Sequence, residues 1–523
     1  MIGSTIIGST VIGVTTGNGL YHPEIILMRF LNTLLLTIPL LCVGSLSQAD
    51  PSVADDYFLT IGGGYAPSGN QVSLENNVLF FQRVLTDLGL DTSKSDCFFS
   101  DGDAKGHDVQ VMDPQTIPKA NRLMAEFFGN SRSLGLTYRD HRVPNVRAST
   151  RPDNIRKWFV DVGATMQSGD RLLVFVTAHG SRSSSSKEPY ETTIATWGNS
   201  SIKMSEFVGL LDELPDGVDV VSIMVQCHAG GFSRLIFNAG DPDRGMSPQR
   251  RCGFFATVND RPAAGCTPEV DEANYVEYST YFWAALSGRT RMGESIELPD
   301  YDGNGSVSFD EAHAYTILTA DTIDLPNKTS GEFLNQYSKF GKGDSELLKD
   351  DEPYSVILGF ANPVQRAVLE GLSSQLNLEG EKRLLAASDA VDSGSGRGRF
   401  RRRREESDAS RVRREISRDL ERRWPELANI VNPVSIELMT TRSDEFIRAI
   451  EEHKDYKRYR ELADAVLVDE SKRQVKYERF LRVADNVALA ENLRRMGNEE
   501  RIRQFEAIVQ AESGTLGDAG RTQ

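Results

Sequence analysis

Two residue types that carry out covalent catalysis stand two or three positions beyond apolar runs of this sequence. His179 follows the run 171–176, and Cys227 follows the run 218–225. A thiolate can attack an amide carbonyl and form an acyl-enzyme when a nearby imidazole takes up the thiol proton and later protonates the leaving amine. In parallel α/β sheets, ligands bind at the carboxyl ends of the strands. If both runs are strands of one sheet, the pattern predicts a Cys–His dyad at its carboxyl edge.

The order and spacing of the two residues resemble those of one clan of cysteine peptidases. His179 precedes Cys227 by 48 residues, whereas papain-like enzymes place Cys first and caspases place His about 50 residues before Cys. The motif Cys-His-Ala-Gly-Gly-Phe at 227–232 is similar to that of bacterial relatives of legumain. Over roughly residues 55–320 the chain therefore resembles the caspase, legumain and gingipain clan. It departs from metacaspases, which carry an acidic residue at the position of Val225.

The resemblance implies a caspase-like α/β fold, with a mostly parallel sheet covered by helices on both faces, and cysteine endopeptidase activity. Cys227 is expected to be the nucleophile, and His179 the general base or the imidazolium of a preformed ion pair. The backbone N–H groups of Gly180 and Cys227 would stabilise the oxyanion. His228 follows the nucleophile directly, so we expect its ring to point away from the thiol in a structural role. The sequence assigns no third member of a triad.

A second motif indicates a metal site. Residues 300–311 match an EF-hand calcium loop, with Gly at the sixth position and Val at the eighth. The segment before the loop is not clearly helical, so the sequence predicts one structural Ca2+ rather than a paired sensor. The expected ligands are Asp300, Asp302, Asn304, the carbonyl of Ser306, Ser308 and a bidentate Glu311.

Local patterns independently predict an α/β fold around these motifs. Runs rich in β-branched and aromatic residues indicate strands, and apolar residues at helical spacing indicate helices. Their alternation implies a largely parallel sheet with helices on both faces. We expect strands at 56–61, 96–100, 171–176, 192–197 and 218–225, and helices at 72–90, 154–166 (with Thr150 as N-cap), 204–214 and 311–323.

Composition divides the chain into four segments. Residues 1–49 read as a leader and secretory signal, with Met28 as an alternative start and an uncleaved anchor as the alternative role. Residues 50–380 form the catalytic domain, 381–408 a flexible Gly/Ser/Arg linker, and 409–523 a helical region. We expect proteolysis to cut the linker first and release the helical region, and favour another protease over self-cleavage.

The charge of the chain bears on its binding partners, and its cysteines bear on disulfide formation. The chain has 75 acidic and 59 basic residues, and the acidic excess falls in residues 50–396. An acidic exported domain argues against a nucleic-acid partner. Export would expose the cysteines to an oxidising compartment. Cys252 and Cys266 are the best candidates for a disulfide, although a reduced pair fits nearly as well.

Together these patterns predict an exported cysteine endopeptidase, either periplasmic, at the cell surface or secreted. Its substrate would be a protein or peptide, and Ca2+ would stabilise its catalytic domain. The helical region is expected to bind a protein partner, the envelope or the catalytic domain itself. Two alternatives remain: an inactive caspase-like calcium-dependent binding module, and a cysteine transamidase or ligase, which passes through the same acyl-enzyme.

Overall fold

The computed structural model describes residues 54–517 except 132, 344, 468 and 469, and gives no side-chain description for 394–403 and 466–470. The leader and signal predicted at 1–49 lie outside the described residues. None of the described helices combines the length and apolar content of a membrane span.

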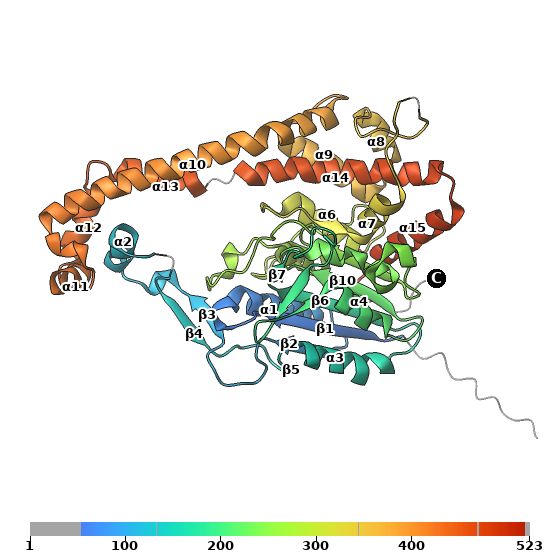
Figure 1. The fold of residues 1–523 in the computed structure, drawn as a ribbon, viewed down its shortest axis with the longest axis horizontal. Coiled ribbons are helices and arrows are strands. Elements are labelled where there is room, and N and C mark those ends of the chain that lie inside the picture. Colours follow the sequence, from blue (N-terminus) through green and yellow to red (C-terminus); the bar gives the residue numbers. More distant parts are fainter. Residues whose placement is uncertain (1–53, 132, 344, 468–469, 518–523) are drawn as a thin grey trace, which may run out of the picture. The chain divides into compact units, whose positions relative to one another are not determined.

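A seven-stranded, mostly parallel sheet with helices on both faces forms the α/β part of the chain (Figure 1). The strand order is β12-β11-β10-β6-β1-β2-β5, in which only β12 is antiparallel to its neighbour. Strands buried on both faces are expected to be almost wholly apolar, as the runs in β6 and β10 are. The strands are β1 (Asp56–Gly63), β2 (Ser95–Phe99), β5 (Val146–Ala148), β6 (Arg171–Ala178), β10 (Asp219–Met224), β11 (Arg251–Phe255) and β12 (Asn327–Lys328).

Alternate residues of β6 enter two different hydrophobic clusters, one on each face of the sheet. Leu172, Val174 and Val176 face the first cluster, and Leu173 and Phe175 face the second. The first cluster includes α3 (Pro152–Asp161), α4 (Met204–Asp212), α7 (Thr329–Tyr337) and α15 (Glu499–Glu512); the second includes α1 (Val72–Asp87), α5 (Tyr278–Ser287) and α6 (Phe309–Thr319).

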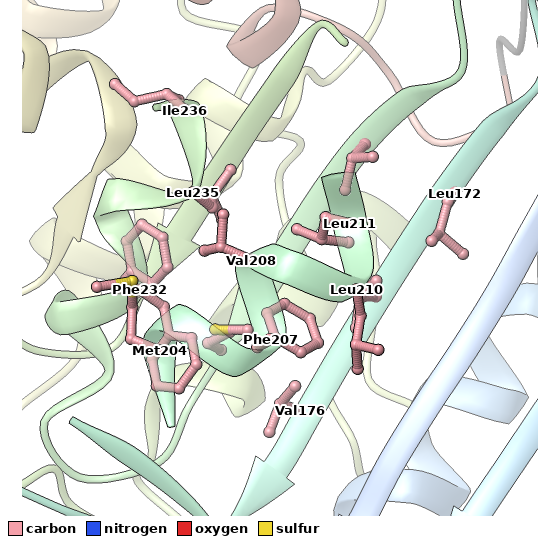
Figure 2. Close-up of a cluster of buried hydrophobic side chains, with 14 of the residues drawn as sticks. Leu172, Val176, Met204, Phe207, Val208, Leu210, Leu211, Phe232, Leu235 and Ile236 are labelled. Carbon is pink, nitrogen blue, oxygen red and sulfur yellow. The ribbon is translucent and has the colours of Figure 1, made fainter. Parts of the chain in front are cut away.

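The first cluster fixes the chain segment that follows Cys227. Figure 2 shows side chains of α4 facing those of β6 and of the 3-10 helix Ala229–Ile236, in which Phe232 is fully buried. The two preceding glycines have no room for a side chain. A Cβ on Gly230 would lie 2.6 Å from the Val258 Cα, and one on Gly231 would lie 2.1 Å from the Thr192 Oγ1. The Gly-Gly-Phe part of the motif therefore has a packing function.

The predicted α/β class is confirmed, and the expected strands and helices around both motifs are present with ends shifted by a few residues. The predicted N-cap of α3 is wrong, because Arg151 occupies that position and the Thr150 Oγ1 accepts the Trp197 N–H at 3.0 Å instead. The sequence also missed an excursion between β2 and β5. It contains β3 (Val109–Met112), α2 (Lys119–Phe128) and β4 (Leu136–Arg139). The strand expected at 192–197 is present as β8 (Thr193–Thr196), but it lies outside the main sheet, in a small antiparallel sheet with β7 (Gly180–Ser181) and β9 (Ser200–Lys203).

The predicted linker at 381–408 is not a break in secondary structure. Helix α10 (Arg383–Arg423) runs through it, although each interior glycine costs a helix about 1 kcal/mol relative to alanine. Helix-favouring residues flank these glycines, and α13 and α14 lie beside α10 (Figure 1). The remaining helices are α8 (Tyr354–Phe360), α9 (Pro363–Leu376), α11 (Pro433–Met439), α12 (Ser443–Glu451), α13 (Tyr456–Leu467) and α14 (Glu470–Arg495).

Candidate active site

The two catalytic candidates lie at the same level of two neighbouring strands. Met224 of β10 is in register with Val176 of β6, so Cys227 and His179 each follow that rung by three residues. The motifs touch through their backbones, because a Cβ on Gly180 would lie only 2.1 Å from the Cys227 carbonyl oxygen. Only glycine fits this close approach. The structure thus places both predicted residues at the carboxyl edge of the sheet.

The imidazole of His179 is oriented by the loop that follows β1. Its Nε2 lies 2.9 Å from the Gly69 carbonyl oxygen and 2.9 Å from the Gln71 Oε1, and the edge of Tyr65 packs on the ring. Two acceptors at Nε2 favour the tautomer with the proton on that nitrogen, which leaves Nδ1 as the base. Burial lowers the pKa of His179, while the hydrogen bond to Gly69 acts in the opposite direction.

Sequence reasoning missed this loop as part of the site. Asn70 is fully buried; its Oδ1 accepts the Gly64 N–H at 2.9 Å, and its Nδ2 donates to the Asp108 Oδ2 at 3.1 Å. These bonds hold the loop so that the Gly69 carbonyl meets His179. The glycines at 62–64 predict a sharp turn after β1, but no local pattern shows which carbonyl meets a side chain 110 residues away.

The thiol of Cys227 is contacted by the loop that follows β11. The Ala263 N–H donates to the Sγ at 3.3 Å, and the thiol donates to the Ala263 carbonyl at 3.7 Å. Burial raises the pKa of Cys227, the Ala263 N–H opposes this, and the nearby Asp324 carboxylate adds to the increase. With the lowered pKa of His179, these shifts favour a neutral thiol and a neutral imidazole over a preformed ion pair.

The Gly180 N–H, one of the two predicted oxyanion donors, points away from the neighbouring strand β8. The Ala195 N–H donates to the His179 carbonyl at 2.9 Å, so Gly180 and Ile194 form a non-hydrogen-bonded pair of the antiparallel β7–β8 ladder. In such a pair the N–H groups face outward from the ladder. The Gly180 N–H is therefore directed away from β8 and is not consumed by the ladder.

His228 is held by two backbone carbonyls of the loop that follows β11. It adopts a left-handed conformation with φ of 61°. Its Nδ1 lies 3.0 Å from the Asn259 carbonyl oxygen, and its N–H donates to the Arg261 carbonyl at 2.9 Å. Both bonds tie the residue after the nucleophile to the loop that contacts the thiol.

The suggested disulfide between Cys252 and Cys266 is not present, because both residues are free cysteines. Cys252 is a fully buried member of β11 within the second hydrophobic cluster. Cys266 lies in the loop after β11, where burial raises the pKa of its thiol. Proximity in sequence misled the prediction, since Cys252 lies within strand β11 and Cys266 lies in the loop after it.

The predicted calcium loop brings three of its carboxylates together. Ligand atoms of Asp300, Asp302 and Glu311 all lie within 4.8 Å of one another. The Asp300 Oδ2 accepts the Gly305 N–H at 2.9 Å, which folds the loop around its sixth position, where φ is +87°. This conformation requires a glycine-like residue. Three of the predicted ligands therefore converge in the loop.

Other predicted ligands have different partners in this conformation. The Asn304 Oδ1 accepts from the N–H and the hydroxyl of Ser306. Ser308 is the N-cap of α6 in a capping box with Glu311. The buried Glu311 carboxylate also accepts the Tyr301 N–H at 2.7 Å. Bidentate binding of a cation by Glu311 would therefore replace hydrogen bonds that now satisfy its oxygens.

Comparison with known proteins adds little to this geometry. No family model matches the chain, and no curated protein matches it. Among solved structures, the chain is similar to the crystal structure of protein GSU0716 from Geobacter sulfurreducens, at 11% identity and a TM-score of 0.29. The match covers 52% of this chain and 92% of the other. A similarity this low carries no argument about fold or function, so any functional conclusion rests on the site.

Proposed function

We propose that the chain is a cysteine endopeptidase in which Cys227 is the nucleophile and His179 the acid–base residue. The supporting observation is the position of the two residues, at one level of adjacent parallel strands, with Gly180 packed on the Cys227 backbone. The acceptors at the Nε2 of His179 add to this, because they leave Nδ1 as the basic nitrogen.

In the proposed reaction the scissile carbonyl binds between the thiol and the imidazole. The Nδ1 of His179 accepts the thiol proton as the Sγ of Cys227 forms a bond to the carbonyl carbon. The negative charge on the carbonyl oxygen is stabilised by the Gly180 N–H and the Cys227 N–H. The imidazolium then donates its Nδ1 proton to the amide nitrogen, the C–N bond breaks, and water hydrolyses the acyl-enzyme with His179 as base.

The two alternative functions, a transamidase and an inactive binding module, can be distinguished from a peptidase by their products. A transamidase would transfer the acyl group to an added amine, so product analysis with and without that amine separates transfer from hydrolysis. A binding module without activity would bind peptides but not cleave them. Both dyad residues and the Nε2 acceptors are retained here, which favours an active enzyme over the binding module.

We also infer that the loop 300–311 binds Ca2+ and stabilises the α/β part. Three carboxylates converge in the loop, and α6 begins within it. Oxygen-rich loops of this kind suit a hard cation. Phe309 and Ala312 of α6 belong to the second hydrophobic cluster, so ordering the loop would stabilise packing on that face of the sheet.

The proposed function is tested with Cys227→Ala, His179→Ala and the double variant on a peptide library that varies the residue before the cleavage site. Each single variant should lose about a thousandfold or more in kcat/KM, and the double variant should lose no more, because the pair acts as one unit. His228→Ala serves as the matched control and should retain the mechanism. Turnover by Cys227→Ala near the wild-type rate would overturn the assignment.

A further inference from the structure

A buried arginine of the C-terminal helical region organises a loop close to the catalytic thiol. Arg479 of α14 is 1% exposed. Its guanidinium donates to four carbonyl oxygens and one hydroxyl: Ile317 O (3.1 Å), Ala320 O (2.7 Å), Thr322 O (3.3 Å), Asp324 O (2.8 Å) and Thr322 Oγ1 (2.9 Å). A guanidinium has five N–H donors in a rigid fork, so all five are used to fix the segment 317–324.

The same segment holds the loop that contacts the thiol. Asp324 is 1% exposed, and its Oδ1 accepts the Ala264 N–H at 2.6 Å. The preceding amide, that of Ala263, donates to the Cys227 Sγ at 3.3 Å. Two consecutive amides of one loop thus point at the carboxylate and at the thiol. The hydrogen bond of the Ala264 N–H to Asp324 therefore also fixes the orientation of the Ala263 N–H that faces the thiol.

A second contact from α14 reaches the same loop. Arg261 forms an ion pair with Glu478, the residue that precedes Arg479. The Arg261 carbonyl in turn accepts the His228 N–H at 2.9 Å. Helix α14 therefore holds the loop on both sides of its contact with Cys227, through Arg261 on one side and through Asp324 on the other.

We propose that Asp324 and Arg479 are positioning residues for Cys227, and that α14 is thereby a working part of the catalytic unit. The proposal rests on the proposed function, because it takes Cys227 as the nucleophile. Neither residue is placed in contact with substrate. Their role is to hold the Ala263 N–H against the sulfur, where a hydrogen-bond donor favours the thiolate that attacks the substrate.

The test compares two pairs of variants by the pH profile of Cys227 alkylation with iodoacetamide, followed by mass spectrometry of the Cys227 peptide. Asp324→Asn and Asp324→Ala both remove the charge, but only Asn retains an acceptor for the Ala264 N–H. The midpoint of the profile should lie at least about half a pH unit higher for Asp324→Ala than for Asp324→Asn. The plateau rate separately reports access to the thiol.

The variant Arg479→Lys keeps the positive charge but loses the planar guanidinium with its five N–H donors. Its midpoint should rise above that of wild type, and kcat should fall about tenfold with little change in KM. The matched control is Arg251→Lys, since Arg251 is an equally buried arginine of β11 that bonds Asp212 and Gln249 instead of this loop. It should lower the melting temperature and leave the midpoint unchanged. If Arg479→Lys does not fold, the Asp324 pair decides the question alone.

Equal midpoints for Asp324→Ala and Asp324→Asn would overturn the proposal. The alkylation assay needs no substrate, so it separates this proposal from the proposed function. Shifted midpoints in a protein that cleaves no peptide would support the positioning role and refute the peptidase. Peptide cleavage with equal midpoints would support the peptidase and refute the positioning role.

Discussion

Raising the pH from 6 to 8 is expected to accelerate alkylation of Cys227 about a hundredfold, because the structure favours a neutral resting dyad. Burial and the Asp324 carboxylate raise the pKa of the thiol above its ordinary value of 9.0. Burial lowers the pKa of His179 below 6.5. The thiol is therefore protonated and the imidazole unprotonated near pH 7. While the pH is below the thiol pKa, the reactive thiolate fraction grows about tenfold with each pH unit.

The alternative resting state is a thiolate–imidazolium ion pair. There the thiol would already be ionised at pH 6, and alkylation would be nearly constant between pH 6 and 8. The two states differ by about two orders of magnitude in the ratio of the rates at these pH values. A flat profile would refute the neutral resting dyad and would show that an imidazolium stabilises the thiolate.

The assay is a short exposure to iodoacetamide at a series of pH values, with quantification of the modified Cys227 peptide by mass spectrometry. Cys252 is fully buried, so its peptide is the internal control for unfolding and should stay unmodified. His179→Ala gives an independent check. Removing a neutral imidazole should leave the midpoint of the profile nearly unchanged, whereas removing the cation of an ion pair would raise it.

Three further predictions concern calcium, the C-terminal helices and a buried carboxyl. Calcium at about 100 times its dissociation constant should stabilise the folded protein by about 2.7 kcal/mol. The variant Glu311→Gln should reduce the resulting rise in melting temperature. A calorimetric scan in which calcium does not change the melting temperature would rule out the calcium site. The sequence predicts that proteolysis between residues 388 and 404 releases the helical region, but α15 belongs to the first hydrophobic cluster. The two fragments should therefore co-elute on gel filtration and separate only in denaturant, and free release of the C-terminal fragment would contradict this. Burial raises the pKa of Glu332 to about 7, so the carboxyl binds a proton more tightly in the folded state than in the unfolded state. Protonation of Glu332 therefore adds to the free energy of unfolding at low pH, and this contribution is lost as the pH rises through about 7. Glu332→Gln should therefore raise the melting temperature relative to wild type more at pH 8 than at pH 5, and a difference independent of pH would show that the carboxyl is not so perturbed.

The α/β class could be predicted because the strands that build the sheet are buried on both faces. Their residues are apolar apart from Arg171, Asp219 and Ser222 in the runs 171–176 and 218–225, and such runs are visible without knowledge of their neighbours. The edge on which His179 and Cys227 lie follows from the same rule, since parallel strands end together. A residue directly after a buried strand is therefore placed by the strand itself.

The backbone groups that contact the two catalytic candidates could not be predicted, because each lies far from its candidate in the sequence. The Gly69 carbonyl meets His179, and the Ala263 amide meets Cys227, and every residue type carries these groups except proline, which lacks the amide hydrogen. The helix that runs through the predicted linker was not visible in the sequence either. Local composition around 393–398 favours coil, but helix α10 continues across it from both sides.

The C-terminal helices are joined to the α/β part by a buried charge cluster as well as by apolar packing. Glu512 of α15 is fully buried and accepts from the Thr329 Oγ1 at 2.8 Å and from the Ser330 N–H at 2.7 Å. Lys328 of β12 lies 3.0 Å from Glu512 and 2.6 Å from Asp310. A buried ion cluster is stable only while all its members stay paired.

Asp310 lies next to Glu311, so the loop 300–311, the edge strand β12 and helix α15 meet at this one cluster. Phe309 also donates its N–H to the Gly514 carbonyl at 2.9 Å, beyond the end of α15. Binding of a cation by the loop would therefore stabilise the attachment of α15, and loss of α15 would leave Lys328 and Asp310 in a broken cluster. It follows that the helical region is folded onto the α/β part by the same contacts that a bound calcium would strengthen.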